Sequence, residues 1–395
     1  MERSLGTLVL FSAILGSVTG LIDYYLWVRL VRSPDLAPTW QRYGTIGAFA
    51  VALLVPLGLF ASPFMPRWGE TLVATLAYGW MGVAIILFFL LAGSELLRLA
   101  LHVGASVAGA PIDEARRTFL SRMIAAGAAG LGLILSGWGL ASALGEVSIH
   151  RVRVPLRRLP RELDGFRIAQ LTDVHIGPTL GREWLAGIVA TVQAEKPDLV
   201  VITGDLVDGS VSELRDHVAP LAFLSAPYGV YFVTGNHEYY SGVEEWIEEL
   251  SRLGIRVLRN ERVCIGEEGG ACFDLAGVDD WSAKRHGNGH GADLGRALAG
   301  REPSRELLLL AHQPKQIEEA REHGVGLQLS GHTHGGQIFP WGYFVRIDQP
   351  FVRGLSQAGD THIYVSSGTG YWGPPMRVGA PPEIALLELI APAAT

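Results

Sequence analysis

Residue types that bind metal ions recur at the ends of five apolar runs in the second half of the chain. Each run is short, rich in leucine, isoleucine or valine, and bounded by glycine or turn residues, which is typical of strands buried on both faces. Ligands of open α/β sheets bind beyond the carboxyl ends of the strands, so the pattern predicts one shared site. The polar residues at these run ends are Asp173, His175, Asp205, Asn236, His237, His312, His332 and His334.

The residue types suit a pair of divalent cations. Carboxylate, imidazole and neutral amide groups together can surround two ions about 3.5–4 Å apart. Asp173 and His175 are two residues apart, as are His332 and His334, so each pair points to one side of an extended segment. A single histidine at a strand end is usually a satisfied polar residue, and Asp205 alone could cap a helix. The metal site is therefore predicted from the whole set.

Charge indicates the substrate class. Two divalent cations with only two anionic side chains, Asp173 and Asp205, leave about two positive charges, which would attract an anionic ester. Such ions lower the pKa of bound water to about 7 and supply a hydroxide for in-line attack. A positioned histidine typically adds about 10²–10⁴-fold by proton transfer. This chemistry hydrolyses phosphoesters without a serine or cysteine nucleophile.

The blocks TDVHIG, GDLVDG, GNHEYY, AHQP and SGHTHGGQ, in this order, resemble the calcineurin-like metallophosphoesterase superfamily and its bacterial membrane-associated phosphodiesterase branch. The resemblance covers about residues 148–395. The chain departs from it at Glu238, where many members carry aspartate, and this puts the fine positioning of His237 in question. The resemblance implies that Asp173, His175 and His334 hold one metal, that Asn236, His312 and His332 hold a second, that Asp205 bridges both, and that His237 binds the substrate oxygen or protonates the leaving group.

The same resemblance implies an α/β (α+β) four-layer sandwich with two mixed β-sheets and the metals at one edge. The expected reaction is hydrolysis of a phosphodiester by attack of a metal-bound hydroxide. A phosphomonoesterase of the same fold is the near alternative. A membrane sensing or transport protein whose domain only binds a ligand is an alternative of another class. Mixed ligand sets of this kind accept Mn, Fe, Zn or Co, so the metal stays open.

The first part of the chain is predicted to lie in a membrane. Over 395 residues, 18% charged residues and a mean hydropathy of +0.26 are too apolar for a typical soluble protein. Four nearly uncharged runs of about 20 residues are long enough to cross a bilayer. We therefore expect a transmembrane region over residues 1–147, with helices at about 5–28, 45–65, 71–93 and 123–144, followed by a catalytic domain over residues 148–395.

Arginines predict the orientation, because short cytoplasmic loops collect basic residues. The first and third loops are the basic ones and should be cytoplasmic. The N-terminus and the catalytic domain would then lie outside a bacterial cell membrane. The basic residues are Arg29, Arg32 and Arg42 in the first loop and Arg98, Arg116, Arg117 and Arg122 in the third.

The residues after the last histidines suggest partners. Arg377 in PPMRVG is predicted to contact the substrate phosphate, since a guanidinium matches phosphate oxygens; a surface arginine is the simpler alternative. Aromatic residues there could contact acyl chains or a membrane surface, or could pack in a core. We expect a phosphoester substrate, with a lipid or envelope polymer as a hypothesis, membrane lipid as a partner, and no nucleic acid. The aromatic and apolar residues are Trp341, Tyr343, Phe344, Phe351, Tyr371, Trp372 and Met376.

The two cysteines, Cys264 and Cys272, flank turn residues in a predicted β-hairpin. They lie opposite each other only if the turn centres on Glu268. A cross-strand disulfide would fit an oxidising compartment. Two unpaired buried thiols are the alternative.

Overall fold

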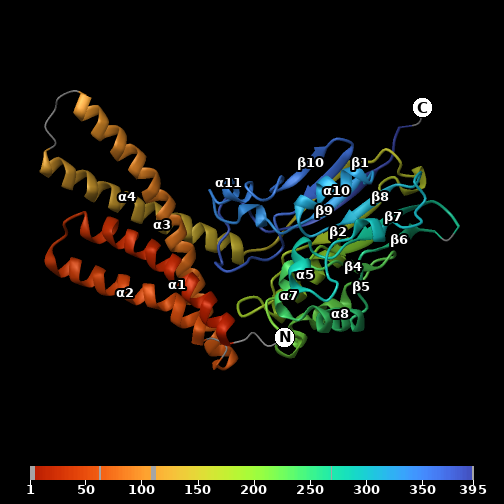
Figure 1. Ribbon diagram of the computed structural model, residues 1–395, viewed down its shortest axis with the longest axis horizontal. Helices are drawn as coiled ribbons and strands as arrows, with labels where there is room; N and C mark the ends of the chain where they lie inside the picture. The colour runs from red at the N-terminus through yellow and green to blue at the C-terminus, as the bar shows by residue number, and fades with distance from the viewer. Residues whose placement is uncertain (1–4, 62–63, 108–112, 268, 394–395) are drawn as a thin grey trace. The chain divides into compact units, whose positions relative to one another are not determined.

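The computed structural model describes residues 5–61, 64–107, 113–267 and 269–393. It divides into two compact units, each formed by discontinuous parts of the chain (Figure 1). The helical unit comprises Met1–Leu144 and Gly373–Val378. The α/β unit comprises Gly145–Trp372 and Gly379–Thr395. The division after Leu144 falls close to the expected boundary at residue 147.

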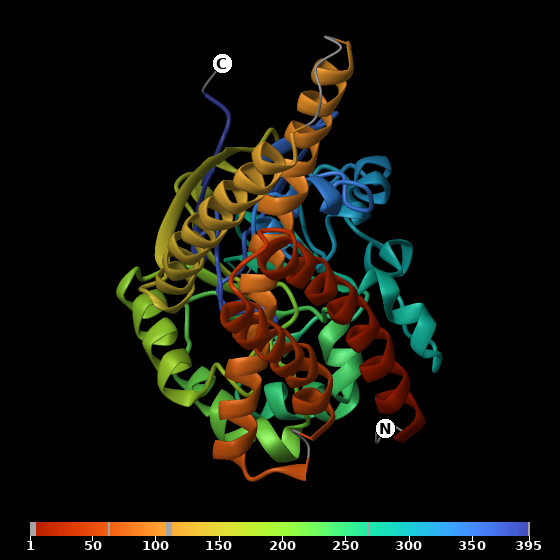
Figure 2. The same ribbon diagram turned by 90° about the vertical axis from the view of Figure 1, so that its left-hand side faces the viewer.

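Long helices make up the helical unit, and Figure 2 shows them from a second side. They are α1 (Leu5–Trp27), which continues into a π-helical turn (Val28–Arg32), α2 (Pro38–Ala61), α3 (Arg67–Val107) and α4 (Glu114–Leu144). Three segments of the described residues are long and apolar enough to span a membrane, namely Ala13–Arg32, Arg67–Gly104 and Glu114–Leu144. Helix α2 is not among them. Residues 62–63 of the expected second span lie outside the described residues.

Helices α3 and α4 are longer than the apolar runs that predicted them. The apolar run of α3 ends near Gly93, but good helix formers such as Glu95, Leu96 and Leu97 carry the helix on to Val107. In the same way α4 begins at Glu114, before its apolar part. Hydropathy marks only the part of each helix that suits lipid, so it does not locate the ends.

Helix α4 faces the rest of its unit with small side chains. A Cβ at Gly132 would lie 2.5 Å from Cδ2 of Leu87 on α3, so glycine lets the Leu87 side chain lie this close to α4 without a shift. Small residues at such contacts favour helix packing in lipid. The buried residues of α4 recur at helical spacing and are all small: Ser121, Ala125, Ala128, Gly132, Ser136, Gly139 and Ala143.

A short segment from near the C-terminus completes the helical unit. The backbone N–H of Arg377 donates to the carbonyl of Gly139, with N and O 2.9 Å apart. A Cβ at Gly139 would lie 2.8 Å from Cγ2 of Val378, and one at Gly82 would lie 2.5 Å from Sδ of Met376. Segment 373–378 therefore packs against α3 and α4 through two glycines.

Two six-stranded mixed sheets form the α/β unit, which confirms the predicted fold class. In the first sheet, the order is β1-β12-β2-β3-β4-β5, and β12 is antiparallel to β2. In the second, the order is β10-β11-β9-β8-β7-β6, with antiparallel pairs at both edges. The strands are β1 (Ser148–Pro155), β2 (Arg167–Leu171), β3 (Leu199–Ile202), β4 (Val230–Phe232), β5 (Arg256–Val257), β6 (Glu261–Gly266), β7 (Cys272–Gly277), β8 (Leu307–Leu310), β9 (Leu327–Ser330), β10 (Gly354–Ala358), β11 (Thr361–Val365) and β12 (Glu383–Ile390).

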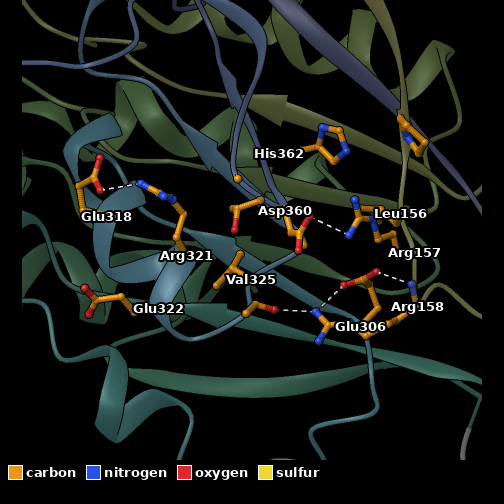
Figure 3. Close-up of a pocket in the computed structure, with 15 residues that line it drawn as sticks. Leu156, Arg157, Arg158, Glu306, Glu318, Arg321, Glu322, Val325, Asp360 and His362 are labelled. Atoms are coloured by element: carbon orange, nitrogen blue, oxygen red, sulfur yellow. Dashed lines mark hydrogen bonds and ion pairs between the residues drawn. The ribbon is translucent and has the colours of Figure 1, made fainter.

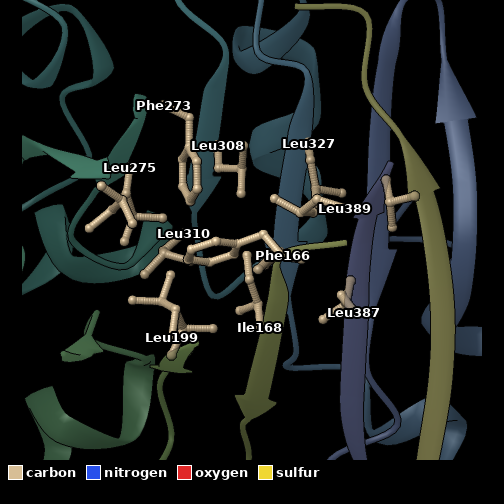
Figure 4. Close-up of a cluster of buried hydrophobic side chains, with 14 of the residues drawn as sticks. Phe166, Ile168, Leu199, Phe273, Leu275, Leu308, Leu310, Leu327, Leu387 and Leu389 are labelled. Carbon is tan, nitrogen blue, oxygen red and sulfur yellow. The ribbon is translucent and has the colours of Figure 1, made fainter. Parts of the chain in front are cut away.

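An apolar core fills the space between the sheets (Figure 4). Phe166, Ile168 and Leu199 from the first sheet region meet Phe273 and Leu308 from the second. All residues of β3, β8 and β9 are buried, as the continuous apolar runs predict for strands covered on both faces. The helices of this unit are α5 (Arg182–Ala194), α6 (Val211–Val218), α7 (Asn236–Ser241), α8 (Val243–Arg252), α9 (Leu294–Ala297), α10 (Ile317–Glu322) and α11 (Gly342–Val345).

The hairpin of β6 and β7 carries a disulfide between Cys264 and Cys272, whose Cα atoms are 6.0 Å apart. The register pairs Cys264 with Asp274 and Cys272 with Gly266, so the cysteines are diagonal neighbours rather than directly opposite. Of the two alternatives for these cysteines, the structure has the cross-strand disulfide, formed without the directly opposite register. Neither cysteine has a free thiol.

The close contact between Gly139 of α4 and Val378 predicts how segment 373–378 responds to a larger residue at position 139. Gly139→Leu should displace the segment, because overpacking of this kind costs about 1–3 kcal/mol. Trypsin should then cleave after Arg377 faster than in the wild type, and thermal unfolding of the full chain in detergent should begin at a lower temperature.

Gly137→Leu is the matched control, since Gly137 lies on the same helix with nothing within 4 Å of an added Cβ. Equal cleavage rates in the two variants would show that the segment does not depend on this contact.

Candidate metal centre

The predicted metal-binding residues follow the ends of strands in both sheets. Strands β2, β3 and β4 are parallel neighbours in the first sheet, and β8 and β9 are parallel neighbours in the second. Their carboxyl ends therefore meet at one edge of the sandwich. The loops there carry Asp173 and His175 after β2, Asp205 after β3, Asn236 and His237 after β4, His312 after β8, and His332 and His334 after β9.

The loops form three groups of possible ligands, and within each group the ligand atoms lie within 4.8 Å of one another. All of the groups are buried or half-buried. His175 belongs to two of the groups, and its Nε2 lies 3.9 Å from Oδ2 of Asp205 in the remaining one. The groups are Asp173, His175 and His334; His175, Asp208 and His237; and Asp205, His312 and His332.

Distances within the first group fit a shared cation. Nε2 of His334 lies 3.1 Å from Nε2 of His175 and 3.4 Å from Oδ1 of Asp173. Two ligand atoms bound to one ion at about 2.1 Å, at angles between right and tetrahedral, are about 3.0–3.4 Å apart. Two imidazole nitrogens that face each other at this distance have the spacing that one ion between them requires.

The group of Asp205, His312 and His332 has the same spacing. Nε2 of His312 lies 3.1 Å from Oδ2 of Asp205 and 3.2 Å from Nδ1 of His332. Oδ2 of Asp205 also lies 3.9 Å from Nε2 of His175 in the first group. The Asp205 carboxylate therefore stands between the two groups, where one carboxylate could contact two ions.

Hydrogen bonds at the far nitrogens orient two of the imidazoles. Nδ1 of His312 lies 2.8 Å from the carbonyl oxygen of Thr203, which can only accept. Nδ1 of His175 lies 3.1 Å from Oδ2 of Asp208. If each Nδ1 carries the proton, each Nε2 presents a lone pair to the cluster, which is the arrangement around metal-bound histidines.

Asn236 supplies a neutral oxygen. Its Oδ1 is buried and has no hydrogen-bond partner among the described residues. Because buried polar atoms are nearly always paired, an isolated carbonyl oxygen beside this cluster fits a cation as its missing partner. The donor chemistry of the site thus suits divalent metals.

Left-handed backbone conformations concentrate at the site. Such conformations cost a non-glycine residue about 1–3 kcal/mol and persist where the surrounding structure enforces them. Two glycines allow the loops to close: a Cβ at Gly331 or at Gly235 would lie 2.1 Å from a carboxylate oxygen of Asp173 or Asp205, respectively. At the site, the residues with φ between 50° and 71° are Asp173, His175, Asp205, His332 and His334.

Asp208 is a site residue that the sequence analysis did not assign. Its two carboxylate oxygens accept from Nδ1 of His175 and from Nδ1 of His237, the latter at 2.5 Å. Burial raises the pKa of Asp208, but the two imidazoles outweigh this and hold it well below its ordinary value. The second aspartate of GDLVDG was the available signal, but its partners lie on other loops.

His237 lies beside the cluster with part of its ring exposed. Burial lowers its pKa, but Asp205 and Asp208 outweigh this and raise the pKa of His237 to about 9. Its Nε2 lies 3.9 Å from Oδ2 of Asp205. The rings of Tyr240 and Trp372 meet it edge-on, with centroids 5.4 and 5.6 Å away. His237 therefore presents an ionisable, partly exposed ring beside the cluster.

Glu238 has a longer side chain than the aspartate that many family members carry at this position of GNHE, and the loops around it accommodate the extra length. Its carboxylate accepts from the backbone N–H of Gly235 at 2.6 Å, of Asp205 at 3.0 Å and of Leu206 at 2.8 Å. Burial and the charge of Asp205 raise the pKa of Glu238 to about 7. Glu238 thus joins the loop that carries Asp205 to the loop that carries Asn236 and His237.

Arg377 is the one predicted site residue that does not belong to the α/β unit. Arg377 belongs to the helical unit and is fully buried there. Of the aromatic and apolar residues noted after the last histidines, Tyr371 and Met376 are buried, whereas Trp341, Tyr343, Phe344 and Trp372 are exposed. A contact between Arg377 and the substrate stays a prediction.

A second hollow, of about 570 Å³, lies where β8, β9 and β11 begin, whereas the metal-binding residue types follow the ends of β8 and β9 (Figure 3). Its arginines are paired with carboxylates. The pairs are Arg157 with Asp360 at 2.7 Å, Arg158 with Glu306 at 3.0 Å and Arg321 with Glu318 at 3.0 Å. Three arginine–carboxylate pairs therefore line the hollow together with Glu322.

Known proteins resemble this chain over much of its length. The family model described as calcineurin-like phosphoesterase matches residues 166–336. A Bos taurus protein named transmembrane protein with metallophosphoesterase domain is 40% identical over 383 residues, covering 93% of this chain and 86% of that protein. A Danio rerio protein of the same name is 36% identical over 409 residues, covering 98% and 90%. An uncharacterized metallophosphoesterase of Helicobacter pylori is 41% identical over 254 residues, covering 64% and 66%.

The chain therefore belongs to the calcineurin-like metallophosphoesterase family, as its five sequence blocks predicted. Membership makes it a phosphoric ester hydrolase, and its apolar helices are candidate membrane spans.

Because Asp208 contacts both His175 and His237, Asp208→Asn should weaken metal binding and also shift the pH–rate profile. Loss of the carboxylate that orients a metal-bound histidine typically costs about 10–100-fold in metal affinity or activity. We expect weaker Mn²⁺ binding by titration calorimetry and a lower kcat. Because the Asp208 charge raises the pKa of His237, its loss lowers that pKa, so the basic limb of the pH–rate profile should move to lower pH.

Asp216→Asn is the control, because Asp216 is exposed on α6, outside the three groups. An unchanged profile in Asp208→Asn would contradict the orienting role.

Proposed function

We propose that this protein is a membrane-anchored phosphodiesterase that depends on two divalent cations. The observation that carries the proposal is a pair of buried donor groups at ligand spacing with the Asp205 carboxylate between them. In the proposed assignment Asp173, His175 and His334 hold one cation, Asn236, His312 and His332 hold the other, and Asp205 contacts both. When bound, the two cations activate water and neutralise phosphoester charge.

The chain's own residues position the proton transfer. Asp208 holds Nδ1 of His237, so Nε2 faces the cluster. A protonated His237 can donate to the leaving oxygen of a substrate at the centre. Glu238 holds the loop of His237 against the loop of Asp205, which keeps donor and cluster in register.

Charge favours a diester over a monoester. Two divalent cations carry four positive charges, and Asp173, Asp205 and the attacking hydroxide together bring three negative ones. The negative charge of Asp208 is offset by the protonated ring of His237, which it contacts. The remaining single positive charge balances the single negative charge of a phosphodiester. A phosphomonoester at neutral pH carries close to two negative charges, so this site would leave part of its charge unbalanced.

Hydrolysis of bis-p-nitrophenyl phosphate by the full chain with Mn²⁺ tests the proposal. Asp205→Asn and His332→Ala should each lower kcat at least about 100-fold, beyond the 10–100-fold typical of residues that only orient ligands. Elemental analysis should show less than two Mn²⁺ per chain in both variants. The diester should be cleaved with a higher kcat/KM than p-nitrophenyl phosphate.

The exposed residues Asp216 and His323 provide the controls Asp216→Asn and His323→Ala, which should keep metal and activity. Full turnover in both site variants would refute the metal assignment. A higher kcat/KM for the monoester would refute only the proposed specificity for a diester.

A substrate at the membrane is the accompanying hypothesis. Only residues 145–147 separate the end of α4 from the start of β1. A linker of this length spans at most about 10 Å, which limits the distance between the end of α4 and the start of β1. This supports a lipid-borne phosphoester or an envelope polymer as substrate.

We also propose that the catalytic unit lies outside the cytoplasm of a bacterial cell. The basic loops support this orientation, and so does the disulfide of Cys264 and Cys272, which is typical of oxidising compartments. An alkaline phosphatase fused to the C-terminus should be active, and one fused after Val107 should be inactive.

Protease access to an N-terminal tag in spheroplasts then distinguishes four membrane spans from three. Four spans leave the tag outside with the catalytic unit, whereas three leave it inside. An inactive C-terminal fusion would overturn the orientation.

A further inference from the structure

Exposed apolar side chains gather in one segment of the α/β unit. Five such residues lie within nine positions, and Phe339, Tyr343 and Ile347 are 64%, 68% and 85% exposed. Elsewhere in the described part of this unit, large exposed apolar residues such as Phe223 and Trp281 are far apart in the chain. We name as the aromatic surface the residues Phe339, Trp341, Tyr343, Phe344 and Ile347.

The rings of the aromatic surface contact one another in two pairs. The ring of Phe339 meets that of Tyr343 at 6.1 Å, and the ring of Trp341 meets that of Phe344 at 5.4 Å. The backbone N–H of Tyr343 donates to the carbonyl of Pro340 at 3.0 Å. Short α11 and its flanking turns thus hold the rings together.

The same segment buries its other apolar residues. Ile338 is buried and bridges to Gly379, and Val352 is buried where its carbonyl accepts from Thr333 at 2.6 Å. Both ends of the segment are therefore fixed in the fold. The aromatic residues are exposed although a core lies beside them, and exposed apolar clusters commonly mark interaction sites.

The chemistry of the surface and the remainder of the chain favour a lipid partner. Tryptophan and tyrosine are enriched where proteins meet the membrane–water interface. The chain has candidate spans, and only three residues join the last of them to β1, so a bilayer is a partner within covalent reach of this unit. Arg346 is exposed in the same segment, while the nearby charge of Asp348 is neutralised by Lys315 at 2.7 Å. The net positive charge suits anionic headgroups.

We propose that the aromatic surface enters the interfacial layer of the membrane in which the chain is anchored. The segment begins five residues after His334, and Gln337 donates to the carbonyl of Trp372 at 2.9 Å. Trp372 in turn meets the ring of His237. Contact with lipid through this surface brings the open side of the metal centre close to the headgroups. The proposal concerns binding and stands whether or not the substrate is a diester.

Spin labels on the full chain test this contact. Both native cysteines are bonded to each other, so under non-reducing conditions a thiol label reacts only with an introduced cysteine. Tyr343→Cys and Ile347→Cys place labels on the aromatic surface. Phe223→Cys, at an equally exposed apolar residue, is the matched control. The chains are placed in nanodiscs that contain phosphatidylglycerol.

The ratio of oxygen to nickel-chelate accessibility should be several-fold higher at positions 343 and 347 than at position 223. Adding Phe344→Glu to the Tyr343→Cys chain should lower that ratio toward the control value. Equal aqueous accessibility at all positions would overturn the proposal. Dipolar broadening at position 343 that disappears on dilution with unlabelled chain would also overturn it, because it would assign the surface to a second copy.

Discussion

The position of Asp205 is the constraint on which the site depends. Its backbone N–H donates to Glu238, and its carbonyl accepts from Val174 and His175. Its carboxylate accepts from the backbone N–H of His237 and lies 3.1 Å from His312. One residue therefore joins the loops that follow β2, β3, β4 and β8. Gly235 is required because any side chain there would collide with this carboxylate.

The second requirement is compensation of buried charge. Burial lowers the pKa of His332 to about 4, and the positive charge of His312 adds to this. Burial also lowers the pKa of His312, but Asp205 outweighs it and raises that pKa well above its ordinary value. Without cations, the cluster can thus keep only some of its imidazoles charged. Divalent cations would replace these protons as partners of the two aspartates, because metal binding displaces protons from its ligands.

The helical unit is built by a different rule. Small residues on α4 allow close packing against α3, and segment 373–378 from near the C-terminus fills a place beside Gly82 and Gly139. The residue before this segment, Trp372, contacts His237 in the α/β unit. The chain is thus covalently continuous from the open side of the metal centre into the packing of the helices. The helical unit consequently needs residues that the sequence places in the catalytic half.

The sequence by itself determined the classes of structure and the chemical inventory. Continuous apolar runs predicted strands buried on both faces, and the residues at their ends predicted the cluster, because strand direction places carboxyl ends at one edge. Long apolar stretches predicted the N-terminal helices. Tertiary structure decided which distant groups meet. It made Asp208 the shared partner of His175 and His237, gave Glu238 three backbone donors, set the diagonal register of Cys264 and Cys272, and placed Arg377 with the helices. Periodicity and residue type are local properties of the chain, whereas these contacts depend on register and packing between segments far apart in it.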